Sequence, residues 1–300
     1  MKKSLEGNEE SDLLVRLNNS FKSLSKGQKQ IASFILENYD KAAFITASKM
    51  GRIVGVSEST VVRFAYTLGY DGYPELQKSL QELIRNKLTS VQRIKLTSDM
   101  SQNDVLKIVL KADMSNIRST IDAIDNTTFN AVVDQLFSAK KVYIIGIRSA
   151  SPLAQLLSYY LGMMLDNIVL VSSSIGDIYE SLFRIDENDA CFGISFPRYS
   201  ARTIDALKFA KSRNARIIAL TDSTFSPIAE LADFSLIAKS DMASFADSLV
   251  APLSLINALI VACSLRRKED VYARFSQLEA LWGSQRIYAS GTGIGETDRL

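Results

Sequence analysis

The sequence predicts a two-part protein, in which an all-α N-terminal domain is joined to an α/β domain with a doubly wound parallel sheet. The chain has 300 residues, enough for two domains of about 150 residues each. From Leu13 to about Leu88, apolar residues recur with helical spacing and no strand pattern interrupts them. From Lys141 onward, short β-branched runs alternate with helical stretches, which is typical of βαβ units in a sheet covered on both faces.

Composition excludes several classes of protein. Apolar residues make up 47% and charged residues 23% of the chain, values that exclude wholesale disorder and fibrous repeats. Histidine is absent, which removes Ser-His triads, histidine bases and histidine metal ligands. Cys191 and Cys263 stand singly in apolar runs. We expect both to be buried thiols in a reducing compartment, with no disulfide framework, no metal and no cofactor.

The sequence shows no signal for export or for a membrane. The first residues carry charge, but no apolar segment follows them. The longest apolar stretch, Leu249 to Cys263, is interrupted by Pro252, Ser254 and Asn257. It is also shorter than the ~20 residues that a membrane span requires. We therefore expect a cytoplasmic protein with no membrane partner.

Charge is distributed unevenly along the chain. Residues 1–95 hold 15 Lys and Arg against 10 Asp and Glu, whereas the rest holds 20 against 23. A basic N-terminal part on a mildly acidic remainder favours a polyanionic partner for that part. The bias is modest, and a solvated surface would also account for it.

Two short helices joined by a tight turn are predicted after Thr46. Each has small or apolar side chains at i, i+3, i+4 and i+7: Ala47, Met50, Gly51 and Val54 in the first, Val61, Phe64, Ala65 and Leu68 in the second. Thr46 and Ser57 are in position to cap them, and Gly55 can take the left-handed conformation that ends the first. Glycine inside a helix costs about 1 kcal/mol relative to Ala, so Gly51 indicates close approach of another helix.

One face of the second predicted helix is polar. With Val61 inward, Ser59 and Arg63 lie on the opposite side, flanked by Thr60 and Thr67. Short hydroxyl side chains let a backbone approach phosphates, and an arginine can bind a guanine edge or a phosphate. The alternative is an ordinary helical hairpin with a solvated face, but spacing, turn and polar face together favour DNA. The candidate DNA-binding residues are Thr46, Ser57, Ser59, Thr60, Arg63 and Thr67.

Domain boundaries follow from these patterns. We place the helix-turn-helix domain at residues 1–84, a polar linker at 85–104, the α/β domain at 105–289 and a disordered tail at 290–300. The expected strands are KVYIIGI, NIVLV, ACFGIS, ARIIALT and a weaker FSLIA, with helices between the first four and only the turn-rich SPIAEL before the last. Pro152 suits the first position of the helix after the first strand. Ligands of such a domain bind at the carboxyl ends of the strands.

Two parts of the chain resemble known domains. GVSESTVVRFAYTLGYDGYPELQKSL, with LSKGQKQIASFILENYDKAAFITASKM before it, resembles the helix-turn-helix of the RpiR family of bacterial transcriptional regulators. The α/β part, including ARIIALTDSTFSPIAELADFSLIA, is similar to a sugar isomerase (SIS) domain, so the resemblance runs from about Leu13 to Leu281. It implies a homodimer or homotetramer that binds palindromic operator DNA and regulates sugar-catabolic genes in response to a phosphorylated sugar.

The SIS resemblance also implies two ligand loops. In the first, Gly146 matches the pattern G-x-G-x-S, whereas Arg148 replaces the second Gly and Ala150 the Ser. In the second, Ser195 and Ser200 match S-x-S-G-x-T, while Pro197 and Arg198 stand at the Ser-Gly positions. The candidate ligand-binding residues are Gly146, Arg148, Ser149, Ser151, Ser195, Arg198, Tyr199 and Ser200.

Arg148 and Arg198 change what these loops can bind. A guanidinium group binds phosphate or carboxylate through two parallel hydrogen bonds. We therefore expect at least one of the two arginines to bind an anion. The alternative is that they pair with Asp177, Asp205 or Glu180, or lie on the surface.

Three functions remain to be weighed. An SIS-fold sugar-phosphate isomerase needs a base that moves a proton between adjacent carbons. No histidine is available and no carboxylate lies within the two loops, while Asp177 and Glu180 equally suit a helix start. A protein-binding regulatory module would not require the polar helix face. We therefore predict a DNA-binding regulator with no catalytic residues.

Overall fold

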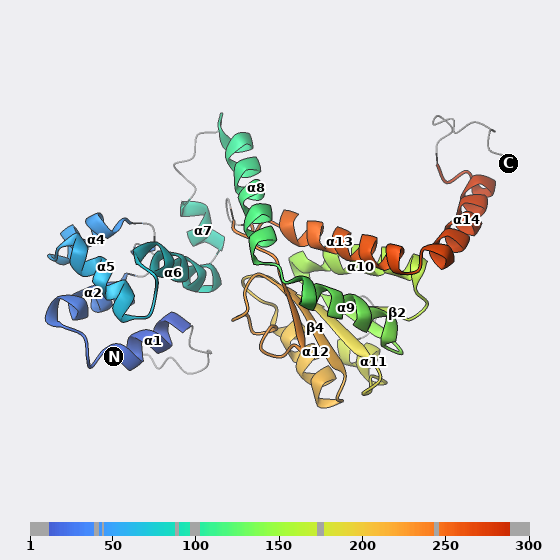
Figure 1. Cartoon of the computed structure of the whole chain (residues 1–300), viewed down its shortest axis with the longest axis horizontal. Helices are drawn as coiled ribbons and strands as arrows, with labels where there is room; N and C mark the ends of the chain where they lie inside the picture. The colour runs from blue at the N-terminus through green and yellow to red at the C-terminus, as the bar shows by residue number, and fades with distance from the viewer. Residues whose placement is uncertain are drawn as a thin grey trace. The chain divides into compact units, whose positions relative to one another are not determined.

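The structure, a computed structural model, describes residues 12–38, 42–43, 45–87, 90–96, 103–172, 177–242 and 246–288 (Figure 1). The predicted disordered tail, 290–300, lies outside these residues. The chain divides into two compact units. The first comprises Met1–Leu106, Pro197–Tyr199 and Met242–Asp247, and the second comprises Lys107–Phe196, Ser200–Asp241 and Ser248–Leu300.

The described part of the first unit contains helices and loops but no strand. Its helices are α1 (Asp12–Ser20), α2 (Lys26–Glu37), α4 (Ala47–Val54), α5 (Glu58–Thr67), α6 (Tyr73–Lys87) and α7 (Ser90–Leu96). Helices α1 to α6 share one core, to which each contributes a fully buried side chain: Leu17, Ile31, Met50, Phe64 and Leu76. The prediction of an all-α N-terminal domain is confirmed. Below, "the head" denotes α1 to α6.

The predicted caps and turn of the helix-turn-helix are also confirmed. Thr46 Oγ1 accepts a hydrogen bond from Lys49 N at 3.2 Å, and Ser57 Oγ accepts one from Thr60 N at the same distance. Gly55 closes α4 in the left-handed conformation, with φ of 78°. Gly51 does allow a close approach, but the atom that it approaches, Val56 O, belongs to the turn and not to the side of another helix.

Gly51→Ala tests this close approach. The added Cβ would lie 2.7 Å from Val56 O. Because the obstructing atom belongs to the backbone, we expect the substitution to cost about 1–3 kcal/mol of head stability. Hydrogen exchange of the α4 and α5 amides measures it. Gly162→Ala in α10 is the matched control, since nothing lies within 4 Å of its added Cβ, and it should gain up to about 1 kcal/mol. Unchanged exchange in Gly51→Ala would mean that the turn yields freely.

The second unit is built on a parallel sheet. Its described strands are β1 (Val142–Gly146), β2 (Ile168–Val171), β3 (Ala190–Ile194), β4 (Arg216–Thr221) and β5 (Phe234–Ile237), in the order β2-β1-β3-β4-β5. All four strand pairs are parallel. Turns without a helix join β4 to β5, as predicted from SPIAEL. The predicted α/β fold is confirmed.

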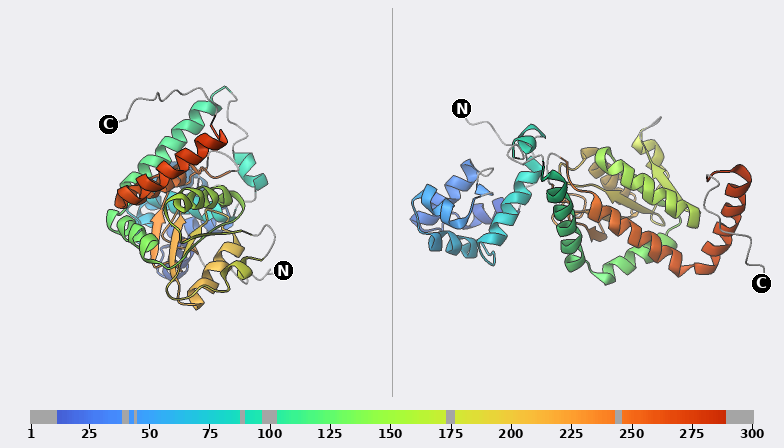
Figure 2. Two further views of the ribbon diagram at one scale, coloured as in Figure 1. Left: turned by 90° about the vertical axis from the view of Figure 1, so that its right-hand side faces the viewer. Right: turned by 90° about the horizontal axis from the view of Figure 1, so that it is seen from above.

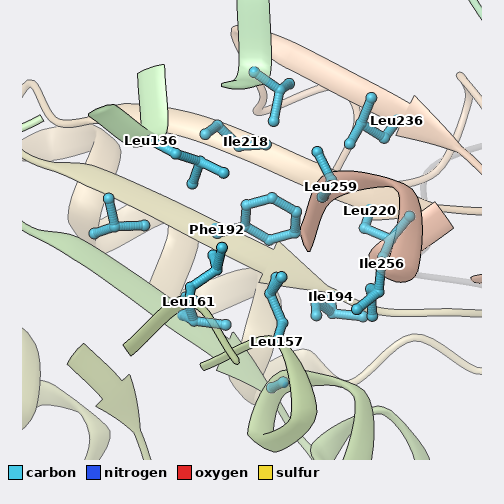
Figure 3. Close-up of a cluster of buried hydrophobic side chains, with 14 of the residues drawn as sticks. Leu136, Leu157, Leu161, Phe192, Ile194, Ile218, Leu220, Leu236, Ile256 and Leu259 are labelled. Carbon is cyan, nitrogen blue, oxygen red and sulfur yellow. The ribbon is translucent and has the colours of Figure 1, made fainter. Parts of the chain in front are cut away.

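Helices cover both faces of this sheet. Helices α9 (Asn126–Ser138), α10 (Ser151–Met164) and α13 (Val250–Arg266) pack on one face, where α10 and α13 lie side by side (Figures 1 and 2). Phe192 is buried on this face among side chains from α10, α13 and β4 (Figure 3). Helices α11 (Ile178–Leu182) and α12 (Ala201–Ser212) cover the other face, into which Tyr143 and Ile145 of β1 point. Successive side chains of β1 and β3 therefore alternate between two faces that are both covered by helices, as in doubly wound folds.

Two further helices, α8 (Val105–Ala123) and α14 (Lys268–Gln285), complete the described part of the chain. Within it no single helix is long and apolar enough to span a bilayer, although α13 and α14 reach that length together across a 103° bend. Both cysteines are buried free thiols, as expected. Burial raises the pKa of Cys191 to about 12 and that of Cys263 to about 11, so neither forms a reactive thiolate near neutral pH.

Candidate functional site

The polar face of α5 is formed as the sequence predicts. Val61, Phe64 and Ala65 are buried in the core of the first unit, and Ser59, Arg63 and Thr67 are exposed on the other side of the helix, with Thr60 half-buried. Arg63 Nε donates to Ser59 O at 3.3 Å, and Thr67 Oγ1 donates to Arg63 O at 2.9 Å. These side chains therefore follow one line along the helix.

A group of hydroxyls lies at the start of α5. Ser57 Oγ shares hydrogen bonds of 2.8 Å with both Ser59 Oγ and Thr60 Oγ1. Thr46, by contrast, caps α4 and is exposed there. Five of the six candidate DNA-binding residues thus belong to α5 and its cap, and the sixth begins the preceding helix.

Helix α2 contributes to the same surface, which the sequence analysis missed. Gln28 Nε2 donates to Thr67 Oγ1 at 2.8 Å. The first turn of α2 and the first turn of α5 line one surface hollow: Ser25, Gly27 and Gln28 on one side, Val56, Ser57, Thr60 and Arg63 on the other. The available signal was the capping box of Ser25 and Gln28. It locates the start of α2, but it cannot show that this start lies beside α5.

The first ligand loop follows β1. A Cβ on Gly146 would lie 2.6 Å from Ala150 O, so only glycine fits there. Arg148 begins a short 3₁₀ turn, η1 (Arg148–Ala150), and has φ of 59°. Ser149 is exposed, and Ser151, the first residue of α10, accepts a hydrogen bond from Gln155 Nε2 at 3.1 Å. The loop therefore runs directly into the N-terminus of a helix, where anions are favoured.

The second ligand loop follows β3. Ser195 is buried, and its Oγ accepts a hydrogen bond from Ser200 N at 3.3 Å. Arg198 has φ of 61°, and its Nη1 donates to Ser90 Oγ at 2.6 Å. Tyr199 and Ser200 are half-buried, and the hydroxyl of Ser200 makes no capping hydrogen bond to α12. Arg198 and Tyr199 belong to the first unit, whereas the other candidate ligand residues belong to the second.

The sheet register brings the beginnings of the two loops together. Gly146 pairs with Ile194 where β1 and β3 end, so both loops leave the same edge of the sheet from neighbouring strands. Within the described part of the chain, neither arginine forms an ion pair with Asp177, Asp205 or Glu180, since Asp177 instead bonds Arg202 at 3.4 Å and closes a capping box with Glu180. Both arginines are exposed, as the surface alternative expected. Among the described residues, the guanidinium of Arg148 has no hydrogen bond or ion pair.

Each of the two candidate ligand loops has an arginine in a backbone conformation that is typical of glycine. Arg148 and Arg198 stand at two of the three positions where the SIS pattern has Gly, and both have positive φ. That conformation costs a non-glycine residue roughly 1–2 kcal/mol. At both positions the backbone thus takes a conformation that glycine favours, and the side chain adds a guanidinium group.

Two charged groups at the same edge of the sheet were also missed. Asp222 follows β4 and is 5% exposed, and Lys239 follows β5 and donates from Nζ to Asp222 O at 3.2 Å. Their positions directly after strands were a usable signal. The described residues hold no group of His, Cys, Asp and Glu suited to a metal ion.

Comparison with known proteins identifies both units. Residues 11–87 match the family described as "Helix-turn-helix domain, rpiR family", and residues 135–262 match the SIS domain family. An uncharacterised HTH-type transcriptional regulator of Haemophilus influenzae is 29% identical over 273 residues, covering 89% of this chain and 94% of that protein.

Two further relatives span most of the chain. The HTH-type transcriptional regulator HexR of Pseudomonas aeruginosa is 22% identical, covering 86% of this chain and 91% of that protein. The structure of Vibrio vulnificus NanR complexed with ManNAc-6P has the same fold, with a TM-score of 0.57 and 22% identity over 91% of this chain and 98% of that one.

A helix-turn-helix domain followed by an SIS domain defines a class of transcriptional regulators. The chain belongs to the RpiR family of that class.

Substitutions at Arg148 test whether its left-handed backbone is required. We expect Arg148→Gly to unfold near the wild-type temperature, because glycine adopts this conformation without strain. Arg148→Val should be less stable than Arg148→Gly by about 1–2 kcal/mol, because a β-branched residue is poorly accommodated at positive φ. Thermal unfolding followed by the fluorescence of Trp282, the single tryptophan, reports on the second unit. Equal stability of the two variants would show that the loop relaxes to negative φ.

Proposed function

We propose that the protein is an operator-binding transcriptional regulator whose SIS domain binds a small phosphorylated sugar. The observation that carries the proposal is the line of exposed polar side chains on α5, opposite its buried face, within a matched helix-turn-helix domain. The regulators named among its relatives support it.

For DNA, α5 would enter the major groove with its first turn leading. The hydroxyls of Ser57, Ser59 and Thr60 are short enough to let the backbone approach phosphates. Arg63 is exposed, and among the described residues its side chain bonds only to Ser59 O of its own helix, through Nε, so its terminal nitrogens can bind a guanine edge or a phosphate. Thr46, at the start of α4, and Thr67, near the end of α5, would contact the DNA backbone on either side.

Substitution of Arg63 tests this arrangement. Arg63→Ala should weaken binding by about 1–3 kcal/mol to a duplex selected in vitro with the wild-type chain. Arg63→Lys separates two roles: it should restore most of the affinity if the contact is to a phosphate, and little if it is bidentate to guanine. Fluorescence anisotropy at several salt concentrations measures both affinity and salt slope. Unchanged affinity and slope in Arg63→Ala would remove this residue from the interface.

For oligomerisation, the second unit offers exposed apolar side chains. Leu110, Met114 and Ile121 of α8 and Val261 and Leu265 of α13 are all exposed. Exposed apolar groups of this extent mark protein interfaces. We propose that a homodimer, or a tetramer built from it, forms through such helices and presents two heads to half-sites ~34 Å apart.

For the ligand, the carboxyl edge of the sheet offers the chemistry that an anion needs. Gly146 lets the first loop fold back closely on its own strand, α10 and α12 begin at the two loops, and Arg148 is available to bind an anion there. The hydroxyls of Ser149, Ser151, Ser195 and Ser200 add donors. NanR, a protein with this fold, was solved with a phosphorylated amino sugar, which supports a phosphorylated sugar as the class of ligand. Operator binding would place the protein in the cytoplasm.

The competing function is that of an SIS-fold isomerase. We propose that the protein is not an enzyme, because histidine is absent and its named relatives are regulators. Asp222 follows β4 at the carboxyl edge of the sheet and is a carboxylate that an isomerase could use as its base. Conversion of any phosphorylated aldose to its ketose by the purified chain would overturn this proposal.

A thermal screen tests the ligand class. Phosphorylated sugars and amino sugars, the same sugars without phosphate, and small carboxylates are added to the full chain, and unfolding is followed through Trp282. A ligand at 100 times its dissociation constant should stabilise by about 2.7 kcal/mol. We expect stabilisation only by phosphorylated compounds, reduced in Arg148→Gly, which keeps the loop backbone. Stabilisation by carboxylates alone would instead indicate that the arginines have changed the ligand class.

A further inference from the structure

Two side-chain contacts fix the short helix α7 to loop segments that follow β3 and β5. At the first residue of α7, Ser90 Oγ accepts the hydrogen bond from Arg198 Nη1 at 2.6 Å. One turn later, Arg93 Nη1 lies 3.1 Å from Asp247 Oδ1. All four residues lie within the first compact unit, since that unit includes Pro197–Tyr199 and Met242–Asp247.

The two contacts differ in how easily a ligand could replace them. The side chains of Arg93 and Asp247 are 1% and 13% exposed, and removing one partner of a buried ion pair is strongly unfavourable. Arg198 is exposed and bonded to a neutral hydroxyl, an interaction with a small net free energy in water. A phosphate group offers the same guanidinium two charged oxygens, and is the better partner.

Residues that follow β5 also form hydrogen bonds with side chains of α8. Lys239 N donates to Thr120 Oγ1 at 2.9 Å, Asp241 N donates to Asn116 Oδ1 at 3.0 Å, and Ser248 Oγ donates to Asp113 Oδ1 at 2.6 Å. The three acceptors lie on one face of α8. The ion pair of Arg93 with Asp247 is buried, whereas the contact at Ser90 depends on one exposed side chain of the candidate ligand loop.

We propose that α7 is a latch released by the ligand: an anion bound at the second loop takes the guanidinium of Arg198 away from Ser90 and loosens the first turn of α7. The ion pair of Arg93 with Asp247 keeps the remainder of the helix in place. In the sequence, Ser90 follows closely after α6, the last helix of the head. The release thus changes the restraint on the segment that leads from the head. This inference rests on the proposed function, because it assumes that the loop binds an anion.

A double-mutant cycle in the full chain tests the contact itself. Ser90→Ala and Arg198→Gly each remove one partner, and Arg198→Gly keeps the left-handed backbone. Each should raise hydrogen exchange of the α7 amides by about threefold to tenfold, and the double variant should exchange no faster than the faster single one. Val91→Ala, an exposed neighbour on the same helix, is the control and should leave exchange nearly unchanged. Additive effects would mean that Ser90 only caps α7, and would overturn the latch.

A second arm uses inorganic phosphate and glucose 6-phosphate, each titrated into the wild-type chain. We expect exchange to slow in the segment containing Ser195–Ser200 and to rise in α7 to the level of Arg198→Gly. By linkage, Ser90→Ala should bind phosphate more tightly by the factor that it adds to exchange. Slower loop exchange with unchanged α7 would overturn the latch and leave the proposed function standing. No response in either segment to either compound would overturn the anion site, and the latch with it.

Discussion

The parallel pairing of β1 with β3 is the constraint on which the candidate ligand site depends. In this register Gly146 stands opposite Ile194, so both loops begin at one edge. A shift of one residue would reverse the faces on which Ile144 and Phe192 pack, moving them out of the core shared with α10 and α13. The buried side chains of the two strands therefore fix where Ser149 and Ser195 can lie.

Much of this fold could be predicted from the sequence, because the signals are local. Thr46, Ser57 and Gly55 define the helix-turn-helix within a dozen residues, and each acts on backbone groups close to it in sequence. The strands were equally legible, since each is a largely apolar run. The central strands β1 and β3 are buried along their whole length, whereas the edge strands β2 and β5 are only partly buried.

What could not be predicted depends on contacts between distant residues. Gln28 meets Thr67 across 39 positions, and Arg198 meets Ser90 across 108. No periodicity or cap signal encodes such a pair, because it arises only when whole helices have packed. The same holds for Gly51: its helical position was a local anomaly, but the atom that requires glycine, Val56 O, is known only from the folded turn. The positive φ of Arg148 and Arg198 was likewise hidden by residue type.

The membership of α7 has a consequence for how such a protein can change during evolution. The unit that contains the head also takes in Pro197–Tyr199 and Met242–Asp247, so the side chains of α7 are matched to residues far downstream in the sequence. A recombination event that exchanged heads after Leu96 would pair a foreign helix with the native Arg198 and Asp247. One placed before Ser90 would transfer α1 to α6 alone and keep α7 with the loops to which its side chains are matched. New operator specificities should therefore be acquired at the earlier junction.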